Sequence, residues 1–296
     1  MGTSSDRTGI VVGVDGSASA MAAVEWAARE AQLWDRPLHV VHVVPPIVMP
    51  ATPWPELPVA YAEFAEDQAR QITRDAYKVA VEAAPGRIAQ ITTAVLGGPI
   101  LPTLIELSET ADLVVTGCLG TGSVARALLG SVSSGVVHRA HCPVAVIHGE
   151  SSLSPQAPVV VGMDMSPTSE LAAALAFDEA DRRHVELIAV HAWSDMGPLG
   201  FASMNWAPIE WRNLKEHEEN AFDDYLSGWR DRYPTVTVRP VVVADRPASR
   251  LLEQAQQAQL VVVGSDGRGA ATSAALGSVS RAVVHSAQVP VIVVRR

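Results

Sequence analysis

The same short segments occur twice along the chain, in the same order and at a nearly constant distance. Residues 11–17 (VVGVDGS) recur 149 positions later as residues 160–166 (VVGMDMS). Three further pairs are separated by 147 positions: 112–117 (DLVVTG) and 259–264 (QLVVVG), 129–133 (LGSVS) and 276–280 (LGSVS), and 142–146 (CPVAV) and 289–293 (VPVIV). Because copies of one unit fold alike, we expect two similar domains.

The length of the chain agrees with two domains. Its 296 residues are about twice the usual domain size of ~100–150 residues. We expect the first domain in residues 1–148 and the second in residues 158–296, joined by a polar Ser/Pro linker at 149–157. Hydrophobic residues make up 48% of the chain and charged residues 18%, which provides enough apolar side chains for two packed cores.

Short apolar runs alternate with amphipathic segments in each half. In the first half, residues 10–14, 38–43, 91–95, 113–116 and 144–147 are rich in Val and Ile, as are strands buried on both faces of a parallel sheet. Between them, residues 18–33, 60–84, 101–110 and 132–140 have apolar side chains at helical spacing. This alternation predicts an α/β fold with a doubly wound, parallel, five-stranded sheet in each half. Residues 45–58 contain six prolines and predict a surface lid or contact loop.

Charge and cysteine content narrow the class of protein. The net charge is −10, which argues against nucleic-acid binding, because that requires a basic surface. No apolar run approaches the ~20 residues of a membrane span, and the first residues do not have the pattern of a secretory signal. We therefore expect a cytoplasmic protein in which Cys118 and Cys142 are free thiols rather than a disulfide or a metal site.

Three glycine-containing segments are expected at the edge of the sheet where open α/β folds bind ligands. They are residues 13–17 after the first strand, residues 117–120 after the fourth strand, and residues 130–133 at the start of the last helix. The last two segments form the pattern G-x-x-G, nine residues, G-S. The second half repeats it with residues 264–267 and 277–278.

The residue types in this pattern suit the phosphates of a nucleotide. Glycine permits positive φ and lets backbone amides approach a ligand closely, and successive amides form a concave anion site. Ser131 is expected at the N-cap of the last helix, where unpaired N–H groups and the helix dipole favour negative charge. Ser133 adds a hydroxyl donor, while Asp15 and Asp164 suit a purine amino group or a ribose hydroxyl. The alternative is a tight turn that duplication has copied without any ligand.

With these residues, both halves resemble the universal stress protein family, specifically its ATP-binding branch. The resemblance covers the chain except residues 45–58 and the linker, and its tandem arrangement is similar to that of mycobacterial two-domain members linked to growth control. It implies a Rossmann-like fold of the adenine nucleotide alpha hydrolase type, with ATP, alone or with Mg²⁺, as cofactor. It also implies a homodimer paired through last strands such as residues 291–294, although the two halves of a tandem chain could satisfy that edge within one molecule.

The resemblance further implies which residues hold the nucleotide. Asp15 would contact adenine or ribose, residues 41–43 would line the adenine, and residues 117–123 and 131–133 would hold the phosphates. In the first half the expected binding residues are Gly13, Asp15, Val41, Gly117, Cys118, Leu119, Gly120, Thr121, Gly122, Ser123, Gly130, Ser131, Val132 and Ser133. In the second half they are Gly162, Asp164, Val190, Gly264, Ser265, Asp266, Gly267, Arg268, Gly269, Gly277, Ser278, Val279 and Ser280.

The two copies of the pattern differ in charge. Asp266 stands where the first copy has Leu119, and a carboxylate beside phosphates repels nucleotide unless it faces a cation or solvent. Arg268, where the first copy has Thr121, could offset that charge. We therefore expect the second site to bind nucleotide more weakly or to depend more on metal.

Motifs of fast enzymes are missing from the sequence. It contains no Walker-type G-x-x-x-x-G-K-[ST] segment and no H-E-x-x-H metal motif, so we assign no catalytic or metal-ligating residue. His42 and His191, at equivalent positions, are expected to be packed or hydrogen-bonded residues of the fold. The leading hypothesis is an ATP-dependent switch that an unknown regulatory protein partner reads in growth or dormancy control. The alternatives are a slow ATPase or phosphotransferase, and a dimerisation scaffold without nucleotide.

Overall fold

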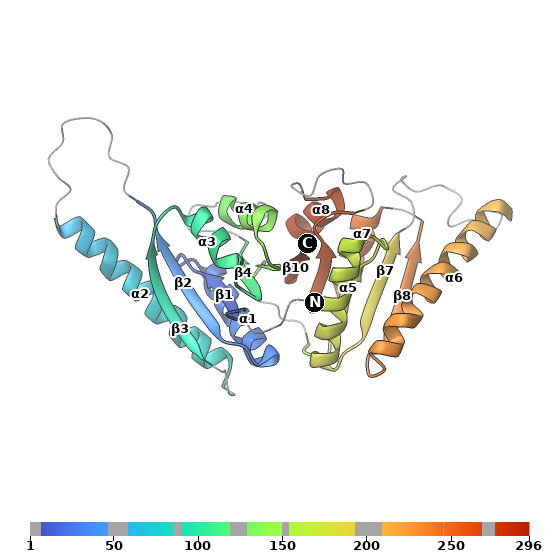
Figure 1. The fold of residues 1–296 in the computed structure, drawn as a ribbon, viewed down its shortest axis with the longest axis horizontal. Coiled ribbons are helices and arrows are strands. Elements are labelled where there is room, and N and C mark those ends of the chain that lie inside the picture. The colour runs from blue at the N-terminus through green and yellow to red at the C-terminus, as the bar shows by residue number, and fades with distance from the viewer. Residues whose placement is uncertain are drawn as a thin grey trace, which may run out of the picture. The chain divides into compact units, whose positions relative to one another are not determined.

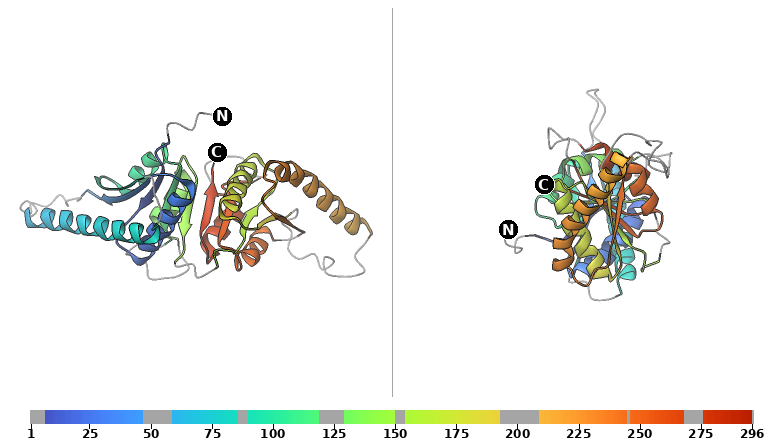
Figure 2. Two further views of the ribbon diagram at one scale, coloured as in Figure 1. Left: turned by 90° about the horizontal axis from the view of Figure 1, so that it is seen from below. Right: turned by 90° about the vertical axis from the view of Figure 1, so that its right-hand side faces the viewer.

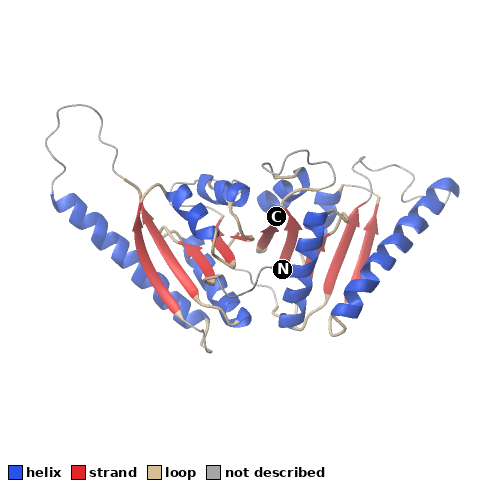
Figure 3. Ribbon diagram, viewed as in Figure 1, coloured by secondary structure: helices blue, strands red, loops and turns tan. Residues whose placement is uncertain are grey.

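The computed structural model describes residues 7–46, 59–85, 90–118, 129–149, 154–192, 209–244, 246–267 and 276–295, with only the backbone of 59–62 and 209–213. The chain divides into two compact units, unit 1 (Met1–Glu150) and unit 2 (Ser151–Arg296). In both, strands and helices alternate around a parallel sheet (Figures 1 and 3). The α/β fold predicted from the sequence is confirmed.

Unit 1 contains five strands and four helices within its described residues. They are β1 (Ile10–Gly13), α1 (Ala18–Trp34), β2 (Leu38–Val44), α2 (Val59–Ala83), β3 (Ile91–Gly97), α3 (Ile100–Ser108), β4 (Leu113–Gly117), α4 (Ser131–Arg139) and β5 (Val144–Ile147). All pairings are parallel, in the order β3-β2-β1-β4-β5. The strand order therefore reverses between β1 and β4.

Unit 2 repeats this arrangement. Its described elements are β6 (Val159–Gly162), α5 (Pro167–Arg183), β7 (Leu187–Ala192), α6 (Ile209–Arg232), β8 (Val238–Val243), α7 (Pro247–Ala255), β9 (Leu260–Gly264), α8 (Ser278–Ser286) and β10 (Val291–Val294). The strands are again parallel, in the order β8-β7-β6-β9-β10. The reversal lies between β6 and β9, which correspond to β1 and β4.

The central strands are short, and nearly every residue in them is buried. Ile10, Leu38 and Leu113 are completely shielded from solvent, as expected for a parallel sheet covered by helices on both faces. α1 and α5 each bury a row of alanines, while the buried Phe177 of α5 stacks on Trp229 of α6 (5.1 Å between ring centroids). Small side chains on these helices allow the backbone of helix and strand to lie close together.

Helices cover both faces of each sheet (Figure 2). In unit 1, α1 packs beside α2 and α3 packs beside α4, which follows from right-handed crossovers that run first toward β3 and then toward β5. Glycines mark the contacts: Gly13 faces Leu104 of α3, whereas Gly117 faces Ser19 of α1. The carboxyl ends of β1 and β4 therefore lie between the middle of α3 and the first turn of α1.

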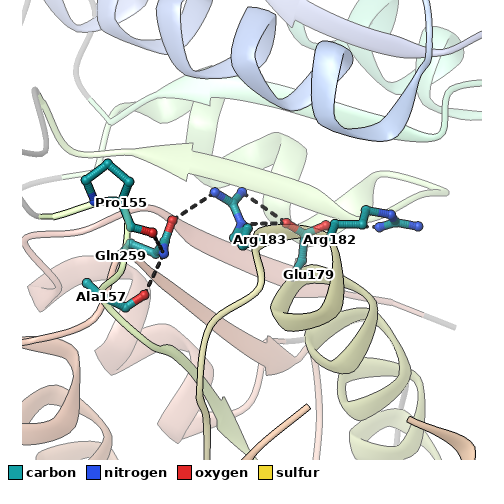
Figure 4. Close-up of polar contacts among 6 residues, drawn as sticks. All are labelled: Pro155, Ala157, Glu179, Arg182, Arg183 and Gln259. Atoms are coloured by element: carbon teal, nitrogen blue, oxygen red, sulfur yellow. Dashed lines mark hydrogen bonds and ion pairs between the residues drawn. The ribbon is translucent and has the colours of Figure 1, made fainter. Parts of the chain in front are cut away.

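The end of the predicted linker is hydrogen-bonded to unit 2. The side-chain amide of Gln259 donates to the carbonyl oxygens of Pro155 (2.8 Å) and Ala157 (2.5 Å). Its oxygen accepts from Arg183 (3.0 Å), which also pairs with the fully buried Glu179 (3.0 Å; Figure 4). This clasp fixes the segment that leads into β6.

None of the helices within the described ranges is long and apolar enough to cross a membrane.

Candidate functional site

The predicted binding residues gather at the carboxyl edge of each sheet, where the strand order reverses. In unit 1 the described ones lie at or just after the ends of β1 and β4, in β2 (Val41), or at the start of α4. The remaining ones lie outside the described residues: Leu119, Gly120, Thr121, Gly122 and Ser123 in the first copy, and Arg268 and Gly269 in the second. The described part of the site therefore consists of strand ends and helix starts.

Asp15 lies in a tight turn between β1 and α1. The amide of Val14 donates to the carbonyl oxygen of Val41 on the neighbouring strand (2.9 Å). One oxygen of the Asp15 carboxylate then accepts from the amide of Ser17 (3.0 Å) across Gly16, whose φ is +83°. Ser17 in turn caps α1 by accepting from Ala20 (3.2 Å). The turn thus places a carboxylate at the edge of the sheet, beside the start of a helix.

The equivalent turn in unit 2 brings Asp164 against the glycine loop. Its Oδ1 accepts from the amide of Ser166 (3.0 Å), and Met165, where unit 1 has Gly16, adopts a φ of +60°. The other oxygen, Oδ2, lies only 2.6 Å from where a Cβ on Gly267 would be. Asp164 and Gly267 are far apart in the sequence, and the fold places them next to each other, as the motif predicted.

Gly117 and Gly264 are required for close packing rather than for a left-handed backbone. Within the described residues, glycines with positive φ are Gly9, Gly16, Gly98 and Gly149, so the expectation of positive φ is wrong for these two. A Cβ on Gly117 would lie 2.7 Å from the backbone carbon and oxygen of Ser19, in the first turn of α1. A Cβ on Gly264 would lie 3.0 Å from Cγ2 of Thr168, the corresponding residue.

The last helix of each unit begins one residue earlier than expected, so its N-cap is a glycine rather than the serine that follows. Gly130 is the N-cap of α4 and Gly277 that of α8, so Ser131 and Ser278 are first helical residues rather than caps. The carbonyl oxygen of Gly130 accepts from the amide of Ser134 (2.9 Å), but glycine has no side chain to cap the helix. The first amides of α4 and α8 therefore end at the sheet edge without a side-chain cap, at the positive end of the helix dipole.

Two serine hydroxyls that were expected to contact phosphate donate within the fold instead. Ser133 donates to the carbonyl oxygen of Gly117 (2.6 Å), and Ser280 donates to that of Gly264 (2.5 Å). Both serines are buried. Since a hydroxyl has one hydrogen to donate, these residues connect the last helix to the end of the fourth strand. Their backbone amides remain part of the helix start.

Cys118 and Ser265 position the last helix through their backbones. The amide of Cys118 donates to Ile147 (2.8 Å), and its carbonyl accepts from the amide of Gly130 (2.7 Å). Ser265 makes the same two contacts, with Val294 (2.8 Å) and Gly277 (2.7 Å). The side chain at this position is therefore free to differ between the copies.

Asp266 lies near a cation that the sequence pattern did not indicate. Burial lowers the pKa of the Arg295 guanidinium, whereas the Asp266 carboxylate raises that pKa, so the two charges interact. We expected Arg268 to offset Asp266, but Arg268 lies outside the described residues. Arg295 directly follows β10, outside the glycine pattern, so no motif marked it.

The paired histidines support the strand ends, as expected. Nδ1 of His42 donates to the carbonyl oxygen of Val14 (2.8 Å), and Nδ1 of His191 donates to that of Met163 (2.7 Å). His191 is completely buried and also lies 3.6 Å from Glu218 of α6. The residues that precede Asp15 and Asp164 are therefore fixed by the neighbouring strand.

The sheet order, the crossovers and the glycine-lined edge define a tandem pair of Rossmann-like α/β domains. The model of the universal stress protein family matches residues 7–148 and again residues 157–295. The chain belongs to the universal stress protein family.

Similar proteins span the whole chain. Universal stress protein Rv1996 of Mycobacterium tuberculosis (strain ATCC 25618 / H37Rv) is 56% identical over 311 residues, covering 100% of this chain and 97% of the relative. Universal stress protein Rv2005c of the same strain is 48% identical over 295 residues, covering 97% of each. The crystal structure of a universal stress protein from Archaeoglobus fulgidus DSM 4304 has a TM-score of 0.67 at 19% identity and covers 98% of both chains, so it shares the fold.

Proposed function

We propose that the chain binds adenine nucleotide, with one ATP site in each unit, and acts as a nucleotide-dependent switch in growth or dormancy control. The observation that carries the proposal is a meeting of three elements at the strand reversal of each sheet. They are an aspartate after the first strand, a glycine that ends the fourth strand, and the start of a last helix capped by glycine.

The start of the last helix suits the phosphates. Helix N-termini attract anions because their first amides have no partner in the helix and the dipole is positive there. In unit 1 these amides belong to Ser131, Val132 and Ser133, and Gly130 contributes no side chain that would occupy the space. Phosphate oxygens would therefore take the place of the missing cap.

The aspartate turn suits the nucleoside. A carboxylate accepts hydrogen bonds from an amino group or a ribose hydroxyl, and Asp15 lies one strand away from the buried Val41. An apolar strand end beside a carboxylate provides a surface for a base and an acceptor for its polar edge. Asp164 and Val190 repeat the arrangement in unit 2.

A cation would be held mainly by the nucleotide itself. Across the described parts of the chain, no three His, Cys, Asp or Glu side chains are grouped so that they could hold a metal ion. Mg²⁺ commonly keeps its waters and binds through phosphates with few protein ligands. We therefore propose that Mg²⁺ accompanies ATP. We further propose that the protein is a cytoplasmic homodimer, and that a protein partner recognises its ATP-bound state.

Two measurements on the full chain test the proposal. Mass spectrometry of the purified protein should identify ATP as the small molecule that co-purifies, and calorimetric titration of the emptied protein should give two equivalents. Asp15→Asn and Asp164→Asn retain an oxygen that can accept from the turn amides but remove the charge. Each variant should lower the ATP affinity of one of the two sites about 10- to 150-fold, as the loss of a charged hydrogen bond of about 1.5–3 kcal/mol implies. A chain that neither carries nor binds nucleotide would overturn the proposal.

A further inference from the structure

The peptide group that joins Met163 to Asp164 is held at both ends. Its carbonyl oxygen, that of Met163, accepts from Nδ1 of His191 on β7 (2.7 Å). Its amide, that of Asp164, donates to the hydroxyl oxygen of Ser169 in α5 (3.2 Å). The direction in which the Asp164 carboxylate leaves the strand therefore depends on both contacts.

The turn of unit 2 needs this support more than the turn of unit 1 does. Met165 has a φ of +60°, whereas glycine, Gly16, takes the corresponding position in unit 1 at +83°. A left-handed backbone is unfavourable for a residue with a side chain, and it persists only where the surroundings hold it. The hydrogen bond from His191 is part of what holds it.

Both ring nitrogens of His191 face oxygen atoms that accept hydrogen bonds. Because a carbonyl oxygen only accepts, Nδ1 carries the hydrogen that reaches Met163. Nε2 is buried and lies 3.6 Å from Oε2 of Glu218 on α6. A neutral ring has one N–H, so its Nε2 would turn a lone pair toward the carboxylate. A doubly protonated, positively charged ring suits both neighbours.

The elements packed against His191 accommodate this charge. Its ring stacks on Phe222 of α6, with 5.0 Å between the ring centroids, and the face of an aromatic ring attracts a cation. On the strands at either side, β8 places the apolar Val242 in register with His191, and β6 leads into the turn that carries the Asp164 carboxylate.

The helices on this face contribute the remaining charged groups. The first turn of α5 carries the carboxylate of Glu170, and Lys215 of α6 is exposed and pairs with Glu219 (3.4 Å). Within the described residues, Glu218 is the charged group that comes within 4 Å of His191. Because burial alone disfavours a charge, the charge on His191 depends on this carboxylate.

His42 in unit 1 makes the equivalent bond without needing a charge. Its Nδ1 donates to the carbonyl oxygen of Val14 (2.8 Å). The residue is partly exposed, so water can donate to the other nitrogen of a neutral ring. The two units therefore hold the aspartate turn with the same nitrogen and differ in what the other nitrogen meets.

We propose that Glu218 is a positioning residue of the second nucleotide site. It keeps His191 positively charged, and the charged ring holds the Met163 carbonyl, and with it the Asp164 turn, more firmly than a neutral ring would, because charge-assisted hydrogen bonds are stronger. The inference rests on the proposed function and extends it: nucleotide affinity at the second site, unlike the first, follows the protonation of one buried histidine.

Calorimetric titration of full-length Glu218→Gln with ATP tests this inference. Glutamine keeps the length of the side chain without its charge, and its amide can donate to Nε2 of a neutral ring. The titrations use the Asp15→Asn background, in which the first site is weakened, so that the tighter binding step belongs to the second site. Glu218→Gln should weaken this step about three- to tenfold, as expected when a charged hydrogen bond becomes a neutral one.

Glu219→Gln is the matched control. It removes the same charge from the same turn of α6, but Glu219 pairs with the exposed Lys215. This variant should bind ATP as the wild-type second site does. An equal loss in the two variants would show that the general charge of α6 matters rather than the contact with His191, and the inference would be wrong.

The pH dependence separates a charge effect from a packing effect. The difference in affinity between the wild-type second site and Glu218→Gln should be largest where the wild-type ring is charged and the ring of the variant is not. It should disappear as the pH rises and the wild-type ring loses its proton. Titrations from about pH 5 to about pH 9 cover the range in which histidines change charge. A difference that is the same at every pH would contradict the inference.

NMR of the ¹⁵N-labelled chain gives a readout that needs no nucleotide. The signals of the His191 ring are assigned by comparison with His191→Gln. Nε2 should keep its hydrogen to a higher pH in the wild-type chain than in Glu218→Gln, whereas Nδ1 should carry hydrogen in both. A wild-type ring whose Nε2 has no hydrogen at any of these pH values would overturn the inference.

The remaining outcomes separate this inference from the proposed function. If the wild-type chain binds two equivalents of ATP and Glu218→Gln matches Glu219→Gln at every pH, the inference is wrong and the proposed function stands. A chain that binds no nucleotide at all overturns both.

Discussion

Gly117 shows how a single residue can hold two helices against one strand end. The first turn of α1 crosses the end of β4 so closely that no Cβ fits between the strand and Ser19. The carbonyl oxygen of Gly117 also accepts a hydrogen bond from the hydroxyl of Ser133 at the start of α4. One glycine thus brings the starts of two helices to the same strand end.

Gly117→Ala should therefore lower stability, by about 1–3 kcal/mol, the usual cost of overpacking. Gly264→Ala should cost less, because its closest contact is a side-chain methyl at 3.0 Å rather than backbone at 2.7 Å. Gly97→Ala is the control, since a Cβ on Gly97 would have nothing within 4 Å of it. Urea unfolding of the three variants gives the comparison, and equal stability of Gly117→Ala and Gly97→Ala would contradict the packing argument.

Because of Cys142, the free energy of unfolding should decrease as the pH rises above 9. Burial raises the pKa of its thiol from 9.0 to about 12. Below pH 9 the thiol is protonated in both the folded and the unfolded chain, so its contribution to stability is complete. Above pH 9 the unfolded thiol ionises and the folded one does not, so stability falls by up to about 1.4 kcal/mol per pH unit until about pH 12.

Cys142→Ala should remove this part of the pH dependence. Between pH 8 and pH 10, the loss of unfolding free energy should be about 1 kcal/mol smaller in the variant than in the wild-type chain. Comparing the change within each protein cancels the cost of the smaller side chain in the core. Urea unfolding at the two pH values is the measurement, and identical losses would show that Cys142 is accessible to ionisation when folded.

At the scale of elements, the last helix of each unit starts without a capping side chain. Gly277 has a φ of −60° and a ψ of 157°, which any residue can adopt. A Cβ there would meet its nearest neighbours, Ser265 and Asp266, only at ordinary contact distance, 3.5–3.6 Å. The absence of a capping side chain at this position is therefore not forced by the backbone.

Gly277→Asp should separate helix stability from anion binding. An aspartate cap accepts from the first amides of α8 and should raise stability by a few tenths of a kcal/mol or leave it unchanged. The same carboxylate would occupy and repel the phosphate position, so ATP affinity at the second site should fall at least about tenfold. Gly277→Asn supplies the cap without the charge and should reduce affinity less. Unchanged ATP binding by Gly277→Asp would place the phosphates elsewhere.

Most elements could be predicted from the sequence because their signals are local. Val- and Ile-rich runs gave the strands to within a few residues, and the repeat gave the second sheet from the first. The roles of individual motif residues were harder to predict. That Gly117 packs on Ser19, and that Ser133 donates to Gly117, depends on how α1 and α4 cross the sheet.

At the scale of the whole molecule, the two units keep one backbone plan and differ at the edge of the sheet. Met165 takes the left-handed position of Gly16. Asp266 stands near Arg295 in the second unit. Duplication of the fold was thus followed by changes in the residues around the strand reversal, where we propose that nucleotide binds.

The chain should bind ATP without turning it over at an ordinary enzymatic rate. Typical enzymes work at about 1–10³ s⁻¹, and this sequence has neither a Walker lysine nor a base placed by motif. Release of phosphate should therefore be well below about 1 s⁻¹, measured with the Asp15→Asn/Asp164→Asn double variant as the background control. A rate within the enzymatic range that disappears in the double variant would favour the ATPase function.

The Gln259 clasp determines where the two halves could be separated. Because Gln259 binds the carbonyl groups of Pro155 and Ala157 while Arg183 and Glu179 hold it in place, these residues belong to the folding unit that follows them. A gene fragment encoding the second half alone should therefore begin no later than Ser154. A fragment starting at β6 would leave the Gln259 amide without two of its acceptors.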